Sequence, residues 1–309
     1  MSRKKIILSC AVTGAIHTPS MSPYLPCGVE GIVGAAVGAA QAGASMVHIH
    51  ARKEDGEPTG DLDTMGAIIS GIKAQSNVVI GITTGGAIGM AAEERYSSIP
   101  RFKPEIASLN AGSINFVLSE LRSFIDEPQH DWELPFLEGT YGKVFTNSFA
   151  DMEYAIKMMN DCGTKQEFEV FDFGQLNNIA YFVKKGIVPE PIFLQFVLGI
   201  QGGPALNIEN LVHITDQAKK LFGKDVQYSI VAGGRRGIRL ETFNAINGGH
   251  CRVGMEDSIY IKPNGELAKS NAQQVEKITD VLHLLDFEIA TPDEAREILL
   301  LKGADKVAF

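Results

Sequence analysis

Eight short apolar runs recur along the chain, and amphipathic stretches separate them. The runs are rich in β-branched and aromatic residues and lie at residues 6–12, 45–51, 78–83, 106–111, 168–173, 192–198, 227–232 and 251–255. They show little alternation of apolar and polar residues, which is typical of strands buried on both faces of a parallel sheet. The pattern therefore predicts eight parallel strands.

Helical patterns fill most intervals between these strands. They are predicted at residues 29–42, 63–75, 148–161, 175–185, 208–221, 240–247 and 271–285. Eight strands that alternate with helices over about 250 residues indicate a (β/α)8 TIM barrel. We expect a single domain of this kind over residues 1–309. A doubly wound sheet, the main rival, would place a GxGxxG turn after its first strand, and residues 11–20 (AVTGAIHTPS) lack one.

One long stretch, residues 116–147, carries neither pattern. It holds the only tryptophan, Trp132, together with Pro128 and Pro135 and mixed charge. Long loops that follow a barrel strand are usually functional or form an interface. We therefore expect an extended loop segment here.

Composition narrows the function classes. The chain has 28 Lys and Arg against 37 Asp and Glu, a net charge of −9, which argues against a nucleic-acid surface but leaves room for a local cationic site. Its four cysteines are far apart, as in a protein with reduced thiols. The first apolar run is too short for a signal peptide or a membrane span, so we expect a cytoplasmic protein.

Two histidines mark the end of the second predicted strand. In a (β/α)8 barrel the active site lies at the carboxyl ends of the strands. His48 and His50 are two residues apart, so in a strand their imidazoles point to the same face. Such a pair suggests a divalent metal site, most commonly for zinc, with Glu256 at the end of the last strand as a third ligand. Two satisfied polar core residues are the alternative.

Arginines at the last two strand ends suggest anion chemistry. Arg252 and Asp257 flank Glu256, and they form either a catalytic pair or a structural ion pair near the rim. Arg235 follows two glycines after the seventh strand. Loops after strands seven and eight often bind phosphate in barrels, so Arg235 is either a contact for a phosphate-bearing ligand or a solvated charge.

Hydrogen-bond donors follow the third and fourth strands. They suit a substrate carboxylate or a developing oxyanion, and they are Thr83, Thr84, Gly86, Ser108 and Asn110. His17 lies in the first loop and could contact substrate. His250 precedes the last strand and has either a supporting role behind the site or a packing role.

With these residues in view, the sequence resembles the β-keto acid cleavage enzyme family, whose founding activity is 3-keto-5-aminohexanoate cleavage. The resemblance runs from residue 6 to about residue 300. It rests on TGA at 13–15, HIH at 48–50, EDG at 54–56, TGGA at 84–87, LNAG at 109–112, QFVLG at 195–199, AGGR at 232–235, GGHCRVGMED at 248–257, SNAQ at 270–273 and ATPDEAREIL at 290–299.

The resemblance implies a zinc-dependent barrel enzyme, usually a homotetramer. The family reaction converts a β-keto acid and acetyl-CoA into acetoacetate and a new acyl-CoA. Carried over by position, the zinc ligands would be His48, His50 and Glu256, and Arg252 and Asp257 the catalytic pair. Thr83 would keep a catalytic hydroxyl, and the residues that hold the substrate carboxylate would be Gly86, Ser108 and Asn110.

One position departs from the family pattern. The founding activity uses a glutamate directly after TGA to bind the ammonium group of its substrate, and this chain has Ile16 there, followed by His17. We therefore expect a substrate other than 3-keto-5-aminohexanoate. An apolar or uncharged tail fits best, and His17 leaves room for a polar or anionic one.

Two other readings remain. Metal-dependent hydrolases of the amidohydrolase type also use HxH in a barrel, but on the first strand and with further histidines at later strand ends. A non-catalytic barrel that binds a metal or metabolite is the other, and the many polar strand ends argue against it.

Overall fold

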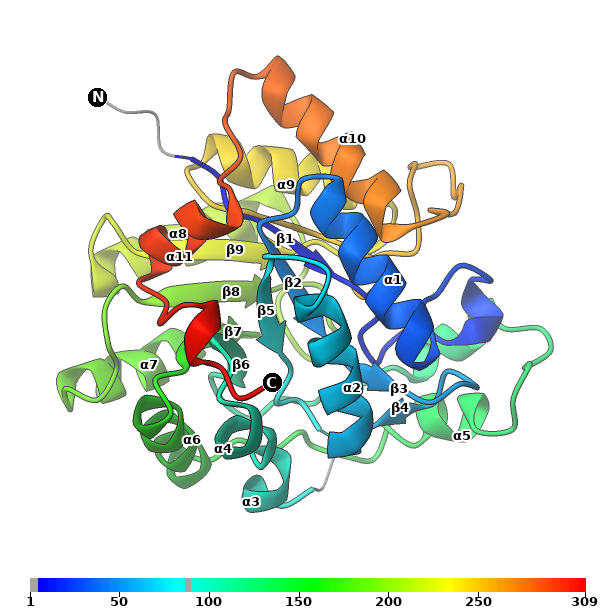
Figure 1. Ribbon diagram of the computed structural model, residues 1–309, viewed down its shortest axis with the longest axis horizontal. Helices are drawn as coiled ribbons and strands as arrows, with labels where there is room; N and C mark the ends of the chain where they lie inside the picture. The colour runs from blue at the N-terminus through cyan, green and yellow to red at the C-terminus, as the bar shows by residue number, and fades with distance from the viewer. Residues whose placement is uncertain (1–4, 87–89) are drawn as a thin grey trace.

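The computed structural model describes residues 5–86 and 90–309, so Ala87, the last residue of the TGGA motif, lies outside it. The chain forms a nearly closed barrel of eight parallel strands with helices around it, which confirms the predicted (β/α)8 fold (Figure 1). The strands, in the order in which they neighbour one another, are β10 (Cys251–Val253), β1 (Leu8–Ala11), β2 (Met46–Ile49), β5 (Val79–Ile82), β6 (Ile106–Asn110), β7 (Lys165–Val170), β8 (Phe193–Val197) and β9 (Gln227–Val231).

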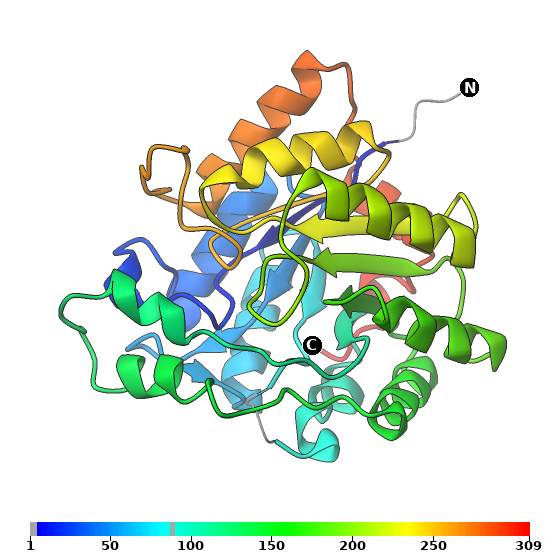
Figure 2. The same ribbon diagram turned by 180° about the vertical axis from the view of Figure 1, so that it is seen from behind.

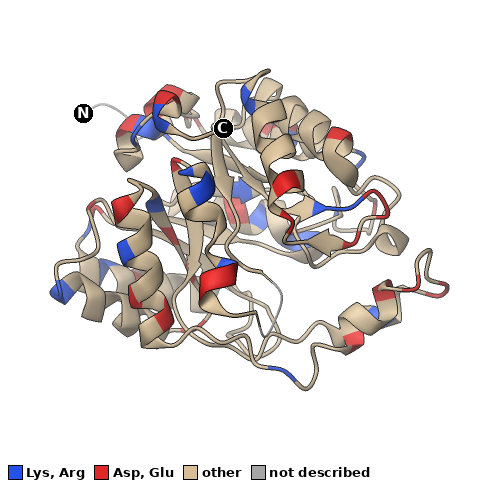
Figure 3. Ribbon diagram, turned by 60° about the horizontal axis from the view of Figure 1, so that its bottom comes forward, with Lys and Arg blue, Asp and Glu red and all other residues tan. Residues whose placement is uncertain are grey.

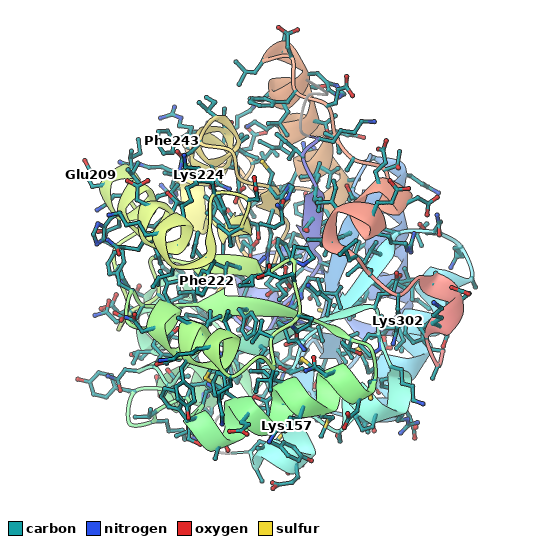
Figure 4. All side chains as sticks on the ribbon, turned by 90° about the vertical axis from the view of Figure 1, so that its left-hand side faces the viewer. Lys157, Glu209, Phe222, Lys224, Phe243 and Lys302 are labelled. Atoms are coloured by element: carbon teal, nitrogen blue, oxygen red, sulfur yellow. The ribbon has the colours of Figure 1, made fainter. Side chains whose placement is uncertain are left out.

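All seven predicted helices are present and cover the outside of the barrel (Figures 1 and 2). They are α1 (Gly28–Gln41), α2 (Leu62–Lys73), α6 (Phe149–Asp161), α7 (Gln175–Lys184), α8 (Ile208–Phe222), α9 (Gly237–Ile246) and α10 (Asn271–Leu284). Their inner faces are apolar, whereas charged residues such as Lys157 on α6 and Glu209 on α8 are exposed (Figure 4).

Several elements have no counterpart in the predicted pattern. They are the hairpin of β3 (Ala51–Arg52) and β4 (Pro58–Thr59), the short helices α3 (Ala92–Arg95), α4 (Ser98–Phe102) and α5 (Glu133–Glu138), and α11 (Pro292–Leu299) near the end of the chain. The start of α11 is encoded locally. Thr291 and Glu294 form a capping box, in which each side chain bonds the other's backbone N–H, and Pro292 occupies the first turn.

The predicted fifth strand is misplaced. The sequence suggested residues 168–173, whereas β7 spans Lys165–Val170. Its first half is charged and polar, yet Lys165 and Glu167 are buried. Both are satisfied by hydrogen bonds: Lys165 Nζ donates to Pro189 O at 3.1 Å, and Glu167 Oε1 accepts from Gln195 Nε2 at 3.2 Å. Because these charged and polar residues have the hydropathy of a loop, the sequence pattern placed the start of the strand three residues too late.

The barrel interior is layered. At the amino ends of the strands it is filled by one apolar cluster, which includes the strand residues Met46, Val79, Ile106 and Phe193 and Ile7 just before β1. Ala295 and Leu299 of α11 close this cluster from below. One step further along the strands, the inward positions become polar, which is unusual for a barrel core and marks the level of the site.

His250 secures the barrel at its amino end. Its backbone N–H donates to Tyr228 O at 2.7 Å and so links β10 to β9, between which no continuous ladder forms in the described residues. The ring Nδ1 accepts from Ile7 N at 2.9 Å, and Nε2 lies 2.9 Å from Gln227 Oε1. His250 therefore has a structural role away from the carboxyl ends of the strands.

The segment 116–147 is an extended loop, as expected, with one 3-10 turn (Ser119–Phe124) and α5. It runs beside the loop that follows β1 in both ribbon views (Figures 1 and 2). An apolar cluster of Leu118, Ile125 and Leu137 packs against Ile16 and Met21 of that loop. The long segment thus lies over the first strand end, at the rim of the site.

In the view of Figure 3, acidic and basic residues are interspersed along the helices and loops. Among the described residues, no helix combines the length and apolarity needed to cross a membrane.

Candidate active site

The carboxyl ends of β2 and β10 bring His48, His50 and Glu256 together. His48 Nε2 lies 3.7 Å and His50 Nε2 3.6 Å from Glu256 Oε1. One ligand atom from each residue lies within 4.8 Å of the other two, as in an open metal site. The sequence prediction that these three residues converge is thus met in the geometry.

The burial and the unpaired polar atoms of these residues suit a divalent metal ion. Both ring nitrogens of His48 and Glu256 Oε2 are buried and have no hydrogen-bond partner among the described residues. Leaving such atoms unpaired costs about 1–3 kcal/mol each, and a bound cation would offset this cost for one His48 nitrogen and for Glu256. Burial lowers the pKa of His48 to about 3, so its imidazole is neutral, the form that binds metals. Two imidazoles and one carboxylate are a typical zinc donor set with an open position.

Glu256 reaches the histidines because Gly14 makes room for it. Gly14, from the TGA motif, has a φ of 58°, and a Cβ at this position would overlap with the Glu256 side chain. Both the backbone conformation and the close approach require glycine here.

Arg252 connects the group of His48, His50 and Glu256 to Asp257. Its Nη2 donates to Glu256 Oε1 at 2.7 Å and to Asp257 Oδ1 at 2.9 Å, and its Nε donates to Asp257 Oδ2 at 2.9 Å. Its Nη1 donates to Gln195 Oε1 at 2.5 Å. The guanidinium is buried and bonds both carboxylates at once, so it fixes Glu256 and Asp257 relative to each other.

The two carboxylates have opposite pKa shifts. Burial alone would raise the pKa of Glu256, but the charge of Arg252 holds it well below its usual range. Burial raises the pKa of Asp257 to about 6, although Arg252 opposes the shift. Glu256 thus stays an ionised carboxylate, whereas Asp257 can take up a proton near neutral pH.

A layer beneath the cluster was missed by the sequence reasoning. Gln195 Nε2 donates to Glu167 Oε1 at 3.2 Å and to Ser229 Oγ at 3.1 Å, and Glu167 Oε2 lies 4.0 Å from His48 Nδ1. Burial raises the pKa of Glu167 to about 7. The available signal was the polar residue inside each strand run, such as the Gln of QFVLG.

Arg52 was missed as well, although it continues the spacing of His48 and His50. It is fully buried and donates to four backbone carbonyls, among them Gly14 O at 3.0 Å and His17 O at 2.8 Å. It therefore fixes the loop after β1. Burial lowers its pKa to about 10, so it remains a buried cation close to the site.

The predicted donors of β5 and β6 divide into two groups. The Thr84 hydroxyl is already used: it donates to Ser108 O at 2.6 Å, and Thr84 N bonds Ser108 Oγ at 3.3 Å. Thr83 Oγ1 accepts from Gly85 N at 2.9 Å and can still donate its proton. The Asn110 amide, Nδ2, is buried without a partner in the described part of the chain, which is the condition of a group that awaits a ligand.

The loop after β1 presents an apolar and a neutral side chain. Ile16 packs against the Leu118 cluster. His17 Nδ1 donates to Met255 O at 2.9 Å, and burial lowers its pKa to about 4, so its ring is uncharged. Gly86, in the loop after β5, is exposed.

Arg235 lies in the loop after β9 and makes no contact with His48, His50 or Glu256 among the described residues. It is exposed and its guanidinium sits 5.1 Å above the centre of the Tyr260 ring. Together with residues of the loops after β9 and β10, it lines a cavity at the surface.

Comparison with known proteins places this geometry in a family. A model of the beta-keto acid cleavage enzyme family matches residues 5–301. The chain belongs to the β-keto acid cleavage enzyme family. It is therefore an enzyme that cleaves a C–C bond of β-keto acids, as the sequence motifs predicted, and the amidohydrolase-type and non-catalytic readings fall away.

Curated relatives align with all or nearly all of this chain. The chain is 45% identical over 309 residues to the 3,5-dioxohexanoate:acetyl-CoA acetone transferase of Paraburkholderia graminis, across 100% of this chain and 99% of that protein. It is 33% identical over 300 residues to the 3-keto-5-aminohexanoate cleavage enzyme of Fusobacterium nucleatum, across 97% and 99%. Among solved structures, apo ObcA has the same fold, with a TM-score of 0.70 and 19% identity over 91% of this chain and 66% of that one.

Proposed function

We propose that this enzyme uses zinc to convert a β-keto acid with an uncharged tail and acetyl-CoA into acetoacetate and a new acyl-CoA. The observation that carries the proposal is the cluster of His48, His50 and Glu256 joined through Arg252 to Asp257. It combines a metal site with a base whose pKa suits neutral pH.

The chemistry needs one acidified carbon. Zinc held by His48, His50 and Glu256 would supply a positive charge that makes the carbon between the ketone and the carboxylate easier to deprotonate. Asp257, held by Arg252, accepts that proton. The free amide N–H of Asn110 donates to the substrate carboxylate, and Ser108 and Gly86 line the same rim. The Thr83 hydroxyl donates to the oxyanion that develops at the thioester.

Bond changes then follow in two steps. The deprotonated carbon attacks the acetyl carbonyl, and the CoA thiolate leaves. The thiolate adds to the original ketone carbon, and the bond between that carbon and the attacking carbon breaks. The electron pair stays on the attacking carbon, which takes back the proton from Asp257. Acetoacetate and an acyl-CoA made from the rest of the substrate are the products, and no oxidant or reductant is needed.

The first loop favours an uncharged substrate tail. Ile16 packs among apolar side chains and His17 is neutral, so neither supplies a negative charge for an ammonium group. A tail that carries only a ketone, as in the substrate named for the Paraburkholderia graminis relative, meets no unpaired charge here. We therefore place 3,5-dioxohexanoate first among the candidate substrates.

A substrate panel tests the proposal. The purified enzyme is incubated with acetyl-CoA and β-keto acids with uncharged, cationic and anionic tails, and acetoacetate is measured. We expect activity with uncharged tails, loss of it after chelation and its return with Zn²⁺. His48→Ala should lose both bound zinc and activity, whereas His283→Ala, at an exposed position on α10, should lose neither. Full activity in metal-free enzyme would refute the metal role.

A further inference from the structure

The chain turns sharply after β10, and this turn carries both Glu256 and Asp257. Asp257 N and Ser258 N both donate to Gly254 O, at 3.1 and 3.0 Å, so the chain leaves the direction of the strand here. Gly254 has a φ of 139°, and a Cβ at this position would lie 2.0 Å from a backbone oxygen of β1, so only glycine fits. We call residues 254–258 the carboxylate turn, since its conformation decides where the two carboxylates lie.

Two buried N–H groups of the carboxylate turn donate to side chains of α10. Gly254 N donates to Gln274 Oε1 and Met255 N to Asn271 Oδ1, each at 2.9 Å. Because both backbone groups are buried, water cannot replace these acceptors. The two amide side chains are therefore needed to keep the backbone of the turn in this conformation.

The same two amides also donate hydrogen bonds. Gln274 Nε2 donates to Ser258 O at 2.7 Å, so Gln274 bonds the carboxylate turn at both of its ends. Asn271 Nδ2 donates to Val12 O at 2.9 Å and thereby ties the turn to the loop after β1, in which Gly14 makes room for the Glu256 side chain. Both amides are buried and bonded through oxygen and nitrogen, which fixes their orientation.

The start of α10 directs both amides toward the turn. Asn271 and Gln274 are three residues apart and so lie on one face of the helix. Ser270 Oγ accepts from Gln273 N at 3.1 Å, and Gln273 Oε1 accepts from Lys269 N at 2.8 Å, which fixes the first helical turn. The helix itself packs between α1 and α9 (Figure 1). The SNAQ motif therefore supplies both the helix cap and one of the two amides.

We propose that Asn271 and Gln274 are positioning residues, which hold Glu256 in reach of the histidines and Asp257 in reach of the substrate. This inference rests on the proposed function. Both residues act through the backbone of the carboxylate turn, and they leave the two carboxylates to Arg252 and to the ligands. Because Arg252 bonds both carboxylates at once, a displaced turn would disturb the metal site and the base together. Residues that orient a metal ligand from behind typically change metal affinity or activity by about 10–100-fold when they are removed.

Metal affinity tests the proposal without turnover. Metal-free wild type and variants are titrated with Zn²⁺ against a chromophoric chelator, and with Co²⁺ to record the absorption spectrum of the site. Asn271→Ala and Gln274→Ala should each raise the Kd for Zn²⁺ about tenfold and alter the Co²⁺ spectrum. Gln274→Glu keeps an acceptor for Gly254 N but not the amide donor to Ser258 O, so its Kd should be intermediate. With saturating Zn²⁺, kcat should still fall about tenfold in both alanine variants, with the KM for acetyl-CoA unchanged.

Asn244 offers a matched control at the other end of β10. It lies on α9, is fully buried and donates from Nδ2 to His250 O at 2.7 Å, just before the strand begins. Asn244→Ala therefore removes a buried amide that bonds the backbone next to the same strand but does not bond the carboxylate turn. We expect a lower melting temperature and a wild-type Kd for Zn²⁺, Co²⁺ spectrum and kcat. An equal loss of Zn²⁺ affinity in Asn244→Ala and Asn271→Ala would overturn the proposal, because the effect would then be one of general stability.

Further results separate this inference from the proposed function. If the wild type forms acetoacetate but the Asn271 and Gln274 variants keep its Zn²⁺ affinity and kcat, the two amides do not position the site, and the reaction assignment stands. If Zn²⁺ affinity depends on both amides but no β-keto acid yields acetoacetate, the positioning role stands and the reaction assignment fails. Should Asn271→Ala not fold, Gln274→Glu still decides the question, and a wild type that binds no Zn²⁺ would overturn the positioning role together with the metal role.

Discussion

Arg252 donates a hydrogen bond to each carboxylate oxygen of Asp257, from Nε to Oδ2 and from Nη2 to Oδ1, both at 2.9 Å. Arg296 makes the same two-pronged contact with Glu105, also at 2.9 Å for both bonds. The second pair lies at the amino end of β6, far along the barrel from the strand ends that carry the metal cluster. The chain therefore offers a matched pair of arginine–carboxylate contacts, of which only one has a proposed role in catalysis.

Arg252→Lys tests that role. Lysine keeps the charge but cannot bind a carboxylate through two parallel bonds, so Asp257 should lose its fixed position. We expect kcat to fall by about 10²–10⁴-fold, the range for removing general base catalysis. Arg296→Lys should lower the melting temperature and leave kcat unchanged. Equal kcat effects in the two variants would show that the loss is one of stability only.

Ile16→Glu tests the specificity position. A carboxylate in the first loop would supply the counter-charge for an ammonium group, so kcat/KM should shift toward amino-bearing β-keto acids relative to uncharged ones. Ile16→Gln is the matched control, because glutamine has a size and polarity similar to those of glutamate but carries no charge. A glutamate variant whose preference equals that of the glutamine variant would remove Ile16 as a selector of substrate charge.

Glu133→Gln tests how the long segment is held. Glu133 is fully buried and accepts from Ser20 Oγ at 2.8 Å, Ser20 N at 3.1 Å and His130 N at 3.0 Å. Although burial opposes the shift, these bonds lower its pKa, so its contribution to stability is present above the unfolded pKa near 4.5 and is lost as pH falls through the folded value.

Measured by urea unfolding at pH 7, this variant should lose about 1–3 kcal/mol. The same measurement near pH 3 should show a smaller difference. Glu138→Gln, at an exposed position on the same helix, should change little at either pH. A loss of equal size at both pH values would mean that the charge of Glu133 is not what anchors the segment.

Glu241→Gln tests a neutral buried carboxyl group. Burial raises the folded pKa of Glu241 well above 4.5, so above pH 4.5 the folded state holds a proton that the unfolded state releases. Wild-type stability should therefore decline as pH rises from about 5 toward the folded pKa, by up to about 1.4 kcal/mol per pH unit. The glutamine variant should lack this decline, and parallel stability curves for the two proteins would contradict the assignment.

Local patterns were sufficient to predict the barrel and the upper rim of the site. The eight apolar runs give the strands, and polar residues at their ends give His48, His50 and Glu256, because strand ends of a parallel barrel meet at one rim. Spacing within one strand is enough to place the two histidines on one face. None of this requires knowledge of which residues touch across the fold.

The layer beneath the rim could not be predicted in this way. Glu167 and Gln195 acquire their roles from the register between β7 and β8 and from contact with Arg252, and no local spacing encodes that register. For the same reason the sequence showed a long loop but not its contact with Ile16, which depends on packing between distant segments.

Isotope tracing tests the central claim most directly. The wild-type enzyme is given an uncharged β-keto acid and acetyl-CoA with ¹³C in both acetyl carbons, and the products are analysed by mass spectrometry. The proposed bond changes predict that both labelled carbons appear in acetoacetate, as its ketone and methyl carbons, and that the new acyl-CoA is unlabelled. Unlabelled acetoacetate, or label in the new acyl-CoA, would contradict the proposed reaction.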